Sequence, residues 1–256
     1  MLDDFTPIIH RLDGRTIKVW AVADVHIGAK EANIDGANGF ASFLRRIEGN
    51  PNDYLVLCGD LISNGIKDSL TNVYDEVIPP QAQCDLAVEL LQPVAHKILG
   101  CVSGNHERRS KKHVDINPMG YICSLLRIPE IYRENMAFVR INLERGKTKD
   151  HYALLLTHGK TANKRRQFAY AVEGVDAIIS GHTHDGEIQK PARLVFTKSN
   201  RVVVKPLVNV CATSWLDPGG YSLAGMMTPK STSDPQCLEL PFTGSNSSTG
   251  QIRVVW

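Results

Sequence analysis

Five short clusters that contain histidine, aspartate or asparagine occur along the sequence, and each follows a run of apolar residues. The clusters are Asp24-Val25-His26, Gly59-Asp60, Gly104-Asn105-His106-Glu107, His158-Gly159 and Gly181-His182-Thr183-His184. Imidazole, carboxylate and amide groups without thiolate bind Mn, Fe, Zn or Ni better than Ca. The seven candidate ligands are too many for one tetrahedral ion; they are Asp24, His26, Asp60, Asn105, His158, His182 and His184. They suit two metal ions that share a bridging carboxylate.

Spacing within the clusters favours a shared site. Asp24 and His26 are separated by one residue, and a regular strand would point both side chains to the same face. His182 and His184 have the same spacing. Glycine beside most of the ligands allows tight backbone turns. Each cluster alone has an ordinary explanation, such as a turn or a structural histidine, but the ordered occurrence of all five favours a metal site.

The clusters lie at the ends of five predicted strands that alternate with predicted helices. Apolar, β-branched runs predict strands at Thr16–His26, Tyr54–Asp60, His96–Glu107, His151–Gly159 and Asp176–His184. Helical periodicity predicts helices at Asn38–Asn50, at Gln81–Lys97 as far as about Pro93, at Asn117–Ile128 and at Asn163–Val172. This alternation predicts a layered α/β domain. Because such sheets bind ligands beyond the carboxyl ends of their strands, the clusters should converge.

The sequence after Lys190 changes character. Strand-like runs separated by proline, glycine and serine lie at Arg193–Thr197, Arg201–Trp215, Cys237–Phe242 and Gln251–Trp256, and Gly244–Gly250 has the composition of a hairpin turn. No linker separates this part from the rest, so we expect a single domain over residues 1–256. Its motif-bearing core covers about residues 16–190, and the mainly β segment 191–256 packs on the same core.

Composition narrows the class of protein. The chain has 256 residues, of which 43% are hydrophobic, enough to bury a substantial core. The net charge of +2 is small, so only local basic patches could attract nucleic acid. No apolar run reaches the roughly 20 residues of a membrane span, and the first residues lack the pattern of a secretory signal, so we expect a cytoplasmic protein. The six cysteines form no CxxC pair and are predicted to be buried, reduced thiols.

The motif series DVH, GDLI, GNHE, THG and GHTH resembles the calcineurin-like metallophosphoesterase superfamily over about Thr16 to Asp185. The resemblance implies an α/β (α+β) fold, a four-layer αββα sandwich with a binuclear metal site at the strand ends. By motif position it implies a bridging carboxylate, Asp60, a first metal bound by Asp24, His26 and His184, and a second bound by Asn105, His158 and His182. It also implies that His106 faces the substrate phosphate or the leaving group. We expect two divalent metal ions, Mn²⁺ before Fe, Zn, Ni or Mg.

This chemistry predicts a metal-dependent phosphoesterase, a hydrolase of phosphoric ester bonds. Two metals can bind both the attacking and the leaving oxygen, and a metal-bridging hydroxide can attack phosphorus in line. We expect a phosphodiester substrate in a nucleotide or nucleic acid, as in a phosphodiesterase or nuclease. The alternatives are a phosphomonoesterase or protein phosphatase-like activity, or a non-catalytic scaffold with the same fold. The segment Gly59–Gly65, GDLISNG, lacks the Asp-Arg pair of the protein phosphatases in this superfamily, which argues against that activity.

Catalytic roles are expected for His106, Asp60 and Asn105. His106 could donate a proton to a departing alkoxide or stabilise the phosphoryl oxygens as charge develops. Two interpretations of Glu107 stay open: it fixes the tautomer of His106, or it is an exposed carboxylate at a helix start. The segment Ser214–Pro229 is either a lid over the substrate or an ordinary turn.

Substrate contacts are expected from residues near the strand ends. Arg108 and Arg109 are candidates for a phosphate clamp, because guanidinium binds phosphate through two hydrogen bonds, and Asn64 is a third candidate. Basic residues cluster at Arg108–His113 and Lys160–Arg166, where they form either a positive rim around the site or two solvated helix faces. The expected partner is a phosphate-ester substrate such as a nucleotide, DNA or RNA, and not a membrane; the oligomeric state is left open.

Overall fold

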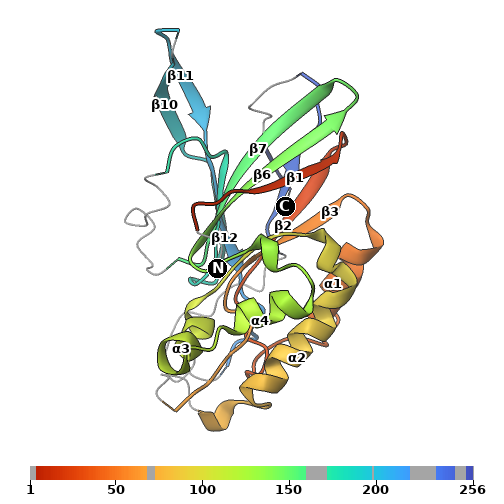
Figure 1. Cartoon of the computed structure of the whole chain (residues 1–256), viewed down its shortest axis with the longest axis vertical. Coiled ribbons are helices and arrows are strands. Elements are labelled where there is room, and N and C mark those ends of the chain that lie inside the picture. Colours follow the sequence, from red (N-terminus) through yellow and green to blue (C-terminus); the bar gives the residue numbers. More distant parts are fainter. Residues whose placement is uncertain are drawn as a thin grey trace.

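The computed structural model of the chain describes residues 4–67, 73–159, 172–197, 199–219, 235–245 and 252–255. Within these residues, two six-stranded β-sheets pack face to face, and helices cover the outer face of one of them (Figure 1). The first sheet has the order β14-β13-β2-β3-β4-β5, with bounds Arg253–Val255, Cys237–Leu240, Ile17–Val22, Asp53–Cys58, Ile98–Val102 and Tyr132–Arg133. The second has the order β1-β6-β7-β8-β12-β9, with bounds Ile8–Asp13, Met136–Arg145, Thr148–Thr157, Ala177–Ser180, Val208–Thr213 and Asp185–Gln189.

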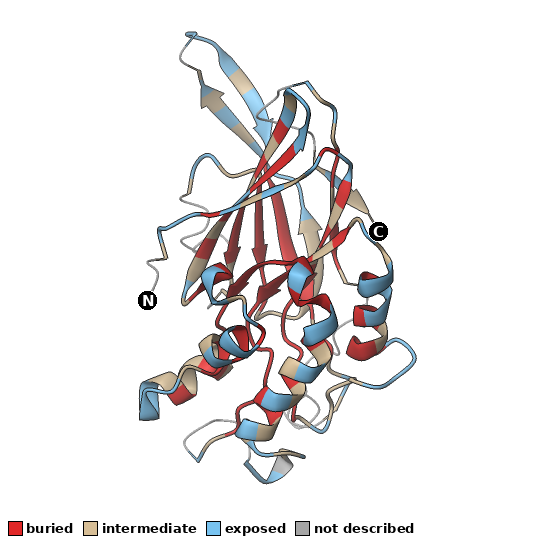
Figure 2. Cartoon of the chain, turned by 45° about the vertical axis from the view of Figure 1, so that its right-hand side comes forward, coloured by how far each residue is buried: buried red, intermediate tan, exposed pale blue. Residues whose placement is uncertain are grey.

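Helices and the second sheet enclose the first sheet. Its strands β2 to β5 run parallel, and β13 and β14 extend it antiparallel. The helices are α1, Phe40–Gly49; α2, Pro80–Leu91; α3, Asn105–Val114; and α4, Pro118–Leu125, with 3₁₀ turns at Val73–Asp75, Gln92–Lys97 and Pro129–Ile131. Every residue of β4 is buried, because both faces of a parallel sheet are covered. The helices bury their inner sides and expose their outer sides (Figure 2). None of the helices in the described ranges is both long and apolar enough to cross a bilayer.

The helix α1 confirms the packing predicted from its sequence. Phe40, Phe43, Leu44 and Ile47 follow the spacing of one helix face, and all four are buried. The ring of Phe43 lies edge-on to the ring of Trp20 in β2, 5.8 Å between centroids. The apolar face of α1 therefore packs on the first sheet.

The side chain of Lys97, from another part of the chain, caps the last turn of α1. The Nζ group of Lys97 donates hydrogen bonds to the backbone oxygens of Ile47 at 2.6 Å, Glu48 at 3.1 Å and Asn50 at 2.6 Å. The last carbonyls of a helix have no partner within the helix, and a cation at this end interacts favourably with the helix dipole. Lys97 satisfies three of these carbonyls and joins α1 to the start of β4.

The second sheet contributes the other half of the core. Its strands β6 and β7 contact β4. Leu154 and Leu156 belong to the main buried cluster, whereas Leu155, between them, belongs to a second cluster with Ile178 and Leu207. Because side chains alternate along a strand, this second cluster lies on the outer face of the sheet. Within the described ranges no helix covers that face, and residues 163–171 of the predicted fourth helix lie outside them.

Most predicted elements are confirmed, and the α/β class is correct. The predicted strand at 96–107 is wrong at its end: β4 stops at Val102 and the GNHE motif opens α3 at Asn105. The helix α2 ends at Leu91 and continues as a 3₁₀ turn that contains Pro93, which cannot donate a helical hydrogen bond. Strands predicted after Lys190 form β10, Ala192–Phe196, and β11, Val202–Pro206, together with β12, β13 and β14. Most of the predicted turn at 244–250 lies outside the described residues.

Replacing Lys97 should destabilise the fold. In Lys97→Met, three backbone oxygens lose a charged donor, and we expect the free energy of unfolding to fall by about 1–3 kcal/mol. Urea unfolding followed by circular dichroism measures this difference. Lys112→Met removes an exposed lysine and should change stability by less than about 0.5 kcal/mol. Equal stabilities of the two variants would contradict the capping role.

Candidate metal centre

The seven predicted ligands lie together beyond the ends of five strands. Asp24 and His26 follow β2, Asp60 follows β3, and Asn105 begins α3 after β4. His158 follows β7, and the His182–His184 segment lies between β8 and β9. Six of these side chains, together with that of His106, form three overlapping groups whose possible ligand atoms lie within 4.8 Å of one another: Asp24, His26 and His184; His26, Asp60 and His106; and Asp60, His158 and His182. Asn105, the seventh, contacts His158 and His182. The structure therefore brings all of these predicted ligands into one continuous cluster.

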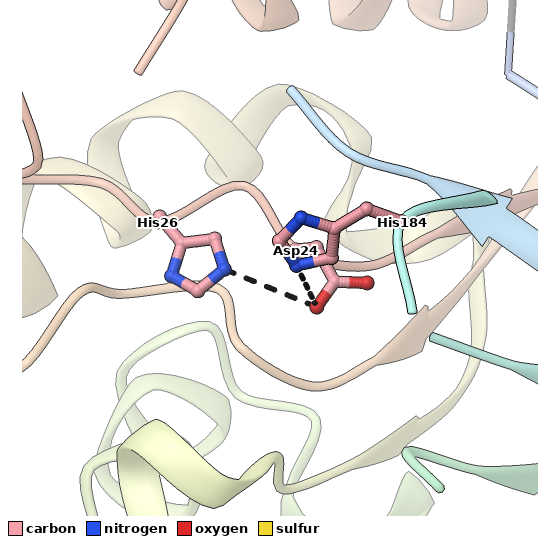
Figure 3. Close-up of side chains that lie close together, drawn as sticks. All are labelled: Asp24, His26 and His184. Atoms are coloured by element: carbon pink, nitrogen blue, oxygen red, sulfur yellow. Dashed lines mark ion pairs between the residues drawn. The ribbon is translucent and has the colours of Figure 1, made fainter. Parts of the chain in front are cut away.

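The first group surrounds the carboxylate of Asp24 (Figure 3). Its Oδ1 lies 3.3 Å from Nε2 of His184 and 3.9 Å from Nε2 of His26. Both Asp24 Oδ1 and His26 Nε2 are buried, and neither has a hydrogen-bond partner among the described residues. Burying such atoms is costly unless they bind something. A divalent cation would satisfy both, so the donor set fits a metal ion.

Two histidines of the third group, His158 and His182, lie against the carbonyl oxygen of the Asn105 side chain. This Oδ1 lies 2.9 Å from Nε2 of His158 and 2.8 Å from Nδ1 of His182. The Oδ2 atom of Asp60 lies 3.2 Å from Nε2 of His158. Asp60 belongs both to the group with His26 and His106 and to the group with His158 and His182. His26 is also in the group with Asp24 and His184, so it connects that group to Asp60. Asp60 thus occupies the central place that a shared carboxylate needs.

The backbone of the ligands adopts an unusual conformation. Five of the nine non-glycine residues with positive φ in the described structure are candidate ligands: Asp24, His26, Asp60, His182 and His184, with φ values of 54°, 51°, 50°, 74° and 58°. The prediction that the paired ligands lie in regular strands is wrong, because β2 ends at Val22 and β8 ends at Ser180. Left-handed backbone in residues with a Cβ stores strain and clusters at functional sites. Here it turns neighbouring side chains inward.

The buried carboxylate of Glu107 joins two of the ligand loops. Its oxygens accept hydrogen bonds from the backbone N–H groups of Gly104 (2.8 Å), Asp60 (3.0 Å), Leu61 (2.7 Å) and Ile62 (3.2 Å). Both interpretations from the sequence are wrong, because Glu107 is 1% exposed and neither ring nitrogen of His106 contacts it. The sequence did contain a signal for this role: Glu107 is the third residue of α3, a position where glutamates that cap helices occur.

Glycine allows the two loops to approach this closely. A Cβ on Gly59, whose φ is +84°, would lie 2.3 Å from the backbone nitrogen of Gly104. A Cβ on Gly104 would collide with the carboxylate of Asp60. The glycines of the GD and GNHE motifs are therefore required by backbone contact as well as by the turn itself.

The ring of His106 has a defined orientation and tautomer. Its Nδ1 lies 2.5 Å from the backbone oxygen of Ser63, and its Nε2 lies 2.9 Å from a guanidinium nitrogen of Arg109. Because arginine only donates, Nε2 accepts and Nδ1 carries the hydrogen that Ser63 accepts. Nε2 also lies 3.7 Å from Oδ2 of Asp60, at the edge of the ligand cluster.

The three predicted substrate-binding residues have different surroundings. Arg109 contacts His106, and a second guanidinium nitrogen donates to the backbone oxygen of Ser63 at 3.3 Å. Arg108 turns the other way and donates to the backbone oxygen of Ser103 at 2.6 Å. Asn64 is fully buried, with its amide nitrogen donating to the backbone oxygen of His106 at 2.6 Å. Of the two predicted arginines, the structure places Arg109 beside the metal ligands.

Parts of two other predicted segments can be located. Trp215, near the start of the Ser214–Pro229 segment, is buried against Phe40, with ring centroids 5.1 Å apart. Its backbone N–H donates to the backbone oxygen of Asp24 at 3.1 Å, so this end of the segment supports the loop of the first metal group. Residues 220–229 lie outside the described structure, as does the basic segment Lys160–Arg166.

Burial and mutual charge set the protonation of the ligands. Burial opposes ionisation of Asp60, but the charges of His158 and His106 outweigh it and lower the pKa of this carboxyl well below its usual range. Burial also disfavours the charged form of His158, yet the Asp60 carboxylate raises the pKa of His158 to about 9. His26 has the opposite balance, because burial and the nearby His106 lower its pKa to about 3. Without metal, His158 is therefore protonated at neutral pH and His26 is not.

Comparison with known proteins identifies the family. Residues 17–186, more than half of the chain, match the family model described as calcineurin-like phosphoesterase. The chain belongs to this family, which confirms the resemblance seen in the sequence. A search of curated proteins found no match.

Two solved structures are similar to this chain over most of its length. One is the calcineurin-like phosphoesterase YfkN from Bacillus subtilis, with 15% identity and a TM-score of 0.42 over 94% of this chain and 88% of that chain. Another is Vps29 from Chaetomium thermophilum, with 11% identity and a TM-score of 0.38 over 93% of this chain and 96% of that chain.

Removing the charge of Glu107 should lower the stability of the metal-free protein. Gln presents one acceptor oxygen and one donor group, so in Glu107→Gln at least one backbone N–H loses its acceptor. We expect a loss of about 2–3 kcal/mol in the stability of the metal-free protein. Urea unfolding measures it. The matched control is Glu134→Gln, which removes an ion pair with Lys111 near the surface and should cost less than about 1 kcal/mol. Equal losses in the two variants would refute the proposed clamp.

Metal uptake should release a proton from His158. Metals bind the neutral imidazole, and the pKa of His158 is about 9 without metal. We therefore expect the affinity for Mn²⁺ to rise about tenfold per pH unit between about pH 6 and 8 for each proton displaced, and to level off above the pKa. Titration calorimetry in buffers of different ionisation enthalpy counts the protons. The variant His158→Asn should release about one proton fewer; an unchanged count would show that His158 is not a proton donor.

Proposed function

We propose that this chain is a metal-dependent phosphoesterase that hydrolyses a phosphodiester bond in a nucleotide or nucleic acid. The convergence of all seven candidate ligands around Asp60 carries the proposal. The buried atoms Oδ1 of Asp24 and Nε2 of His26, which lack hydrogen-bond partners among the described residues, support a metal-binding role for that cluster. A complete ligand set with His106 at its edge favours an enzyme over a non-catalytic scaffold.

In this proposal two divalent ions occupy the centre. Asp60 contributes to both sites, and the remaining ligands are Asp24, His26 and His184 for the first ion and Asn105, His158 and His182 for the second. Mn²⁺ is the preferred ion for this mixture of carboxylate, imidazole and amide, with Fe, Zn, Ni or Mg as alternatives. When bound, two such ions supply positive charge to the phosphoryl oxygens and lower the pKa of a bound water.

His106 and Arg109 would act on the substrate from the start of α3. The bond between Nδ1 of His106 and Ser63 holds the ring so that Nε2 faces Asp60 and Arg109. When the ring is also protonated at Nε2, His106 can donate that proton to the leaving oxygen of the ester. The guanidinium of Arg109 donates to His106 and to Ser63, and it can transfer these hydrogen bonds to a phosphate oxygen.

Arg108 and Asn64 are better assigned to positioning than to the substrate contacts expected from the sequence. Arg108 is engaged by the backbone of Ser103. The amide of Asn64 donates to the backbone of His106, and its oxygen accepts from the hydroxyl of Ser110 at 3.0 Å. Asn64 therefore holds the first turn of α3, and His106 with it, against the loop that follows Asp60.

The charges near His106 favour a diester. A phosphomonoester carries about 1.5–2 negative charges at neutral pH, whereas a diester carries one. The Ser63–Asn64 pair, which stands where related protein phosphatases have Asp-Arg, supplies a backbone oxygen and a buried amide and no cation. In the described part of the chain one guanidinium, that of Arg109, contacts His106, and one such group suits the single charge of a diester. Basic residues farther along α3, such as Lys111, suit neighbouring phosphates of a nucleotide or nucleic acid.

The proposal also places the protein in the cytoplasm. All six cysteines are buried and free. This is the usual state of thiols in reducing compartments.

A comparison of two chromogenic esters tests the proposal. Metal-stripped protein is reconstituted with Mn²⁺ and assayed with bis-p-nitrophenyl phosphate and p-nitrophenyl phosphate. We expect kcat/KM to be higher for the diester. In His106→Ala, kcat should fall about 10²- to 10⁴-fold, and in Arg109→Met, kcat/KM should fall about 10- to 100-fold. Lys112→Met removes the same charge from the exposed part of α3 and should change kcat/KM less than about twofold.

Each alternative function predicts a different result. A higher kcat/KM for the monoester would replace the diester proposal with a phosphomonoesterase. Protein that holds two metals and cleaves neither ester, nor any nucleotide or oligonucleotide, would support the scaffold interpretation. If Lys112→Met and Arg109→Met had equal effects, the specific clamp assigned to Arg109 would be wrong.

A further inference from the structure

A two-stranded ribbon projects from the body of the molecule. The strands β10 and β11 pair antiparallel with each other and belong to neither six-stranded sheet. They extend away from the helices, at the upper left of Figure 1 and at the top of Figure 2. The ribbon is inserted between β9, which begins directly after His184, and β12. It plays no part in the metal centre.

One face of this ribbon is exposed and apolar. Cross-strand register pairs Ala192 with Pro206, Leu194 with Val204 and Phe196 with Val202, and alternation places these six residues on one face. Exposed fractions on this face are 77% for Leu194, 70% for Phe196, 62% for Val202 and 66% for Val204. We call these six residues the ribbon face. Every side chain on it is apolar.

The charged residues of the two strands lie on the other face. Arg193 pairs with Lys205 across the ribbon. The guanidinium of Arg193 donates to the backbone oxygen of Val172 at 3.0 Å, and this side of β10 is partly buried. The two faces therefore differ in kind: one is tied to the body of the protein, and the other is uncharged and open in the described structure.

An isolated ribbon of this kind gains stability by packing. Two strands alone are marginal in water, and further strands or a packed surface are needed. The four large side chains of the ribbon face expose on the order of 400 Å² of apolar surface, as large as the largest patch on a typical monomer. Other exposed apolar side chains, such as Ile9, Val77 and Val114, lie on separate elements and form no comparable ribbon. Single exposed residues of that kind are normal.

We propose that the ribbon face is the contact of a homodimer, in which two copies pack these faces together across a twofold axis. A twofold contact uses the same surface on both subunits, and a flat face of aliphatic and aromatic side chains can pack against itself. The face offers no charge or side-chain hydrogen bond that would select a polar or charged partner. Two copies would bury on the order of 800 Å² from the four large side chains, and the exposed Ala192 and Pro206 raise the total to about 1,000 Å², the lower limit of a specific interface. This inference does not depend on the proposed function.

Sedimentation velocity over a range of concentrations tests the dimer. Wild-type protein should sediment with twice the 28.3 kDa mass of the chain at tens of micromolar. The double variant Leu194→Glu/Val204→Glu should sediment as a monomer, because four like charges would face one another in the contact. The matched control Val114→Glu/Ile116→Glu alters residues that are 62% and 59% exposed at the end of α3 and just beyond it, and it should remain dimeric. Circular dichroism checks that both variants are folded.

Single cysteines on the ribbon face give an independent measurement. All six native cysteines are buried, so a cysteine at 194, 196, 202 or 204 is the accessible thiol. Mild oxidation should yield a disulfide-linked dimer from at least one of these four variants and none from Val114→Cys. Wild-type protein that stays monomeric at every concentration would overturn the proposal, since another part of the chain or a different partner would then cover the face. A dimer that persists in the double glutamate variant would overturn it as well.

Discussion

Four backbone N–H groups point at the carboxylate of Glu107, and the positions of the candidate ligands depend on this contact. It binds the loop after β3 to the loop after β4, and the Asp60 carboxylate reciprocates by accepting the N–H of His106 at 2.8 Å. The loop after β2 then hydrogen-bonds to the Asp60 loop, with the N–H of His26 donating to the backbone oxygen of Asp60 at 3.0 Å. The N–H of His182 donates to Oδ2 of Asp24 at 2.8 Å and adds the second sheet. An ionised carboxylate suits this place because charge-assisted hydrogen bonds are the strong ones.

These hydrogen bonds between loops explain how the candidate ligands keep a strained backbone conformation. A residue with a Cβ in the left-handed region costs on the order of 1–3 kcal/mol, and several ligands adopt that conformation. The strain persists because backbone hydrogen bonds between loops, and the core beneath them, leave no room for relaxation. The aromatic cluster of Trp215, Phe40 and Phe43 lies under the Asp24 loop and contributes to this rigidity. Stability from the core thus supports an arrangement that the loops alone would not adopt.

The candidate ligands and the α/β class could be predicted because they depend on residue type and periodicity, which are local properties. The conformation of the ligand loops could not, since left-handed backbone at Asp24 or His184 is imposed by contacts with other loops. The role of Glu107 was missed because its partners are backbone groups, which carry no side-chain signature. Arg108 and Arg109 are adjacent in sequence, yet successive side chains on a helix point about 100° apart. The rotation of α3 about its own axis decides which of the two guanidinium groups reaches His106.

The distribution of the ligands along the chain also bears on how the protein folds. Asp24 follows a strand of the first sheet, whereas His182 and His184 follow a strand of the second, and the contact between Asp24 and His182 spans 158 residues. Such contacts have a high contact order and form only after long loops have closed. Neither sheet alone carries a complete ligand set, so the centre cannot nucleate folding in the way that a compact zinc motif does. Metal ions would instead bind late, to a chain whose two sheets have already docked, and their binding would report completion of the fold.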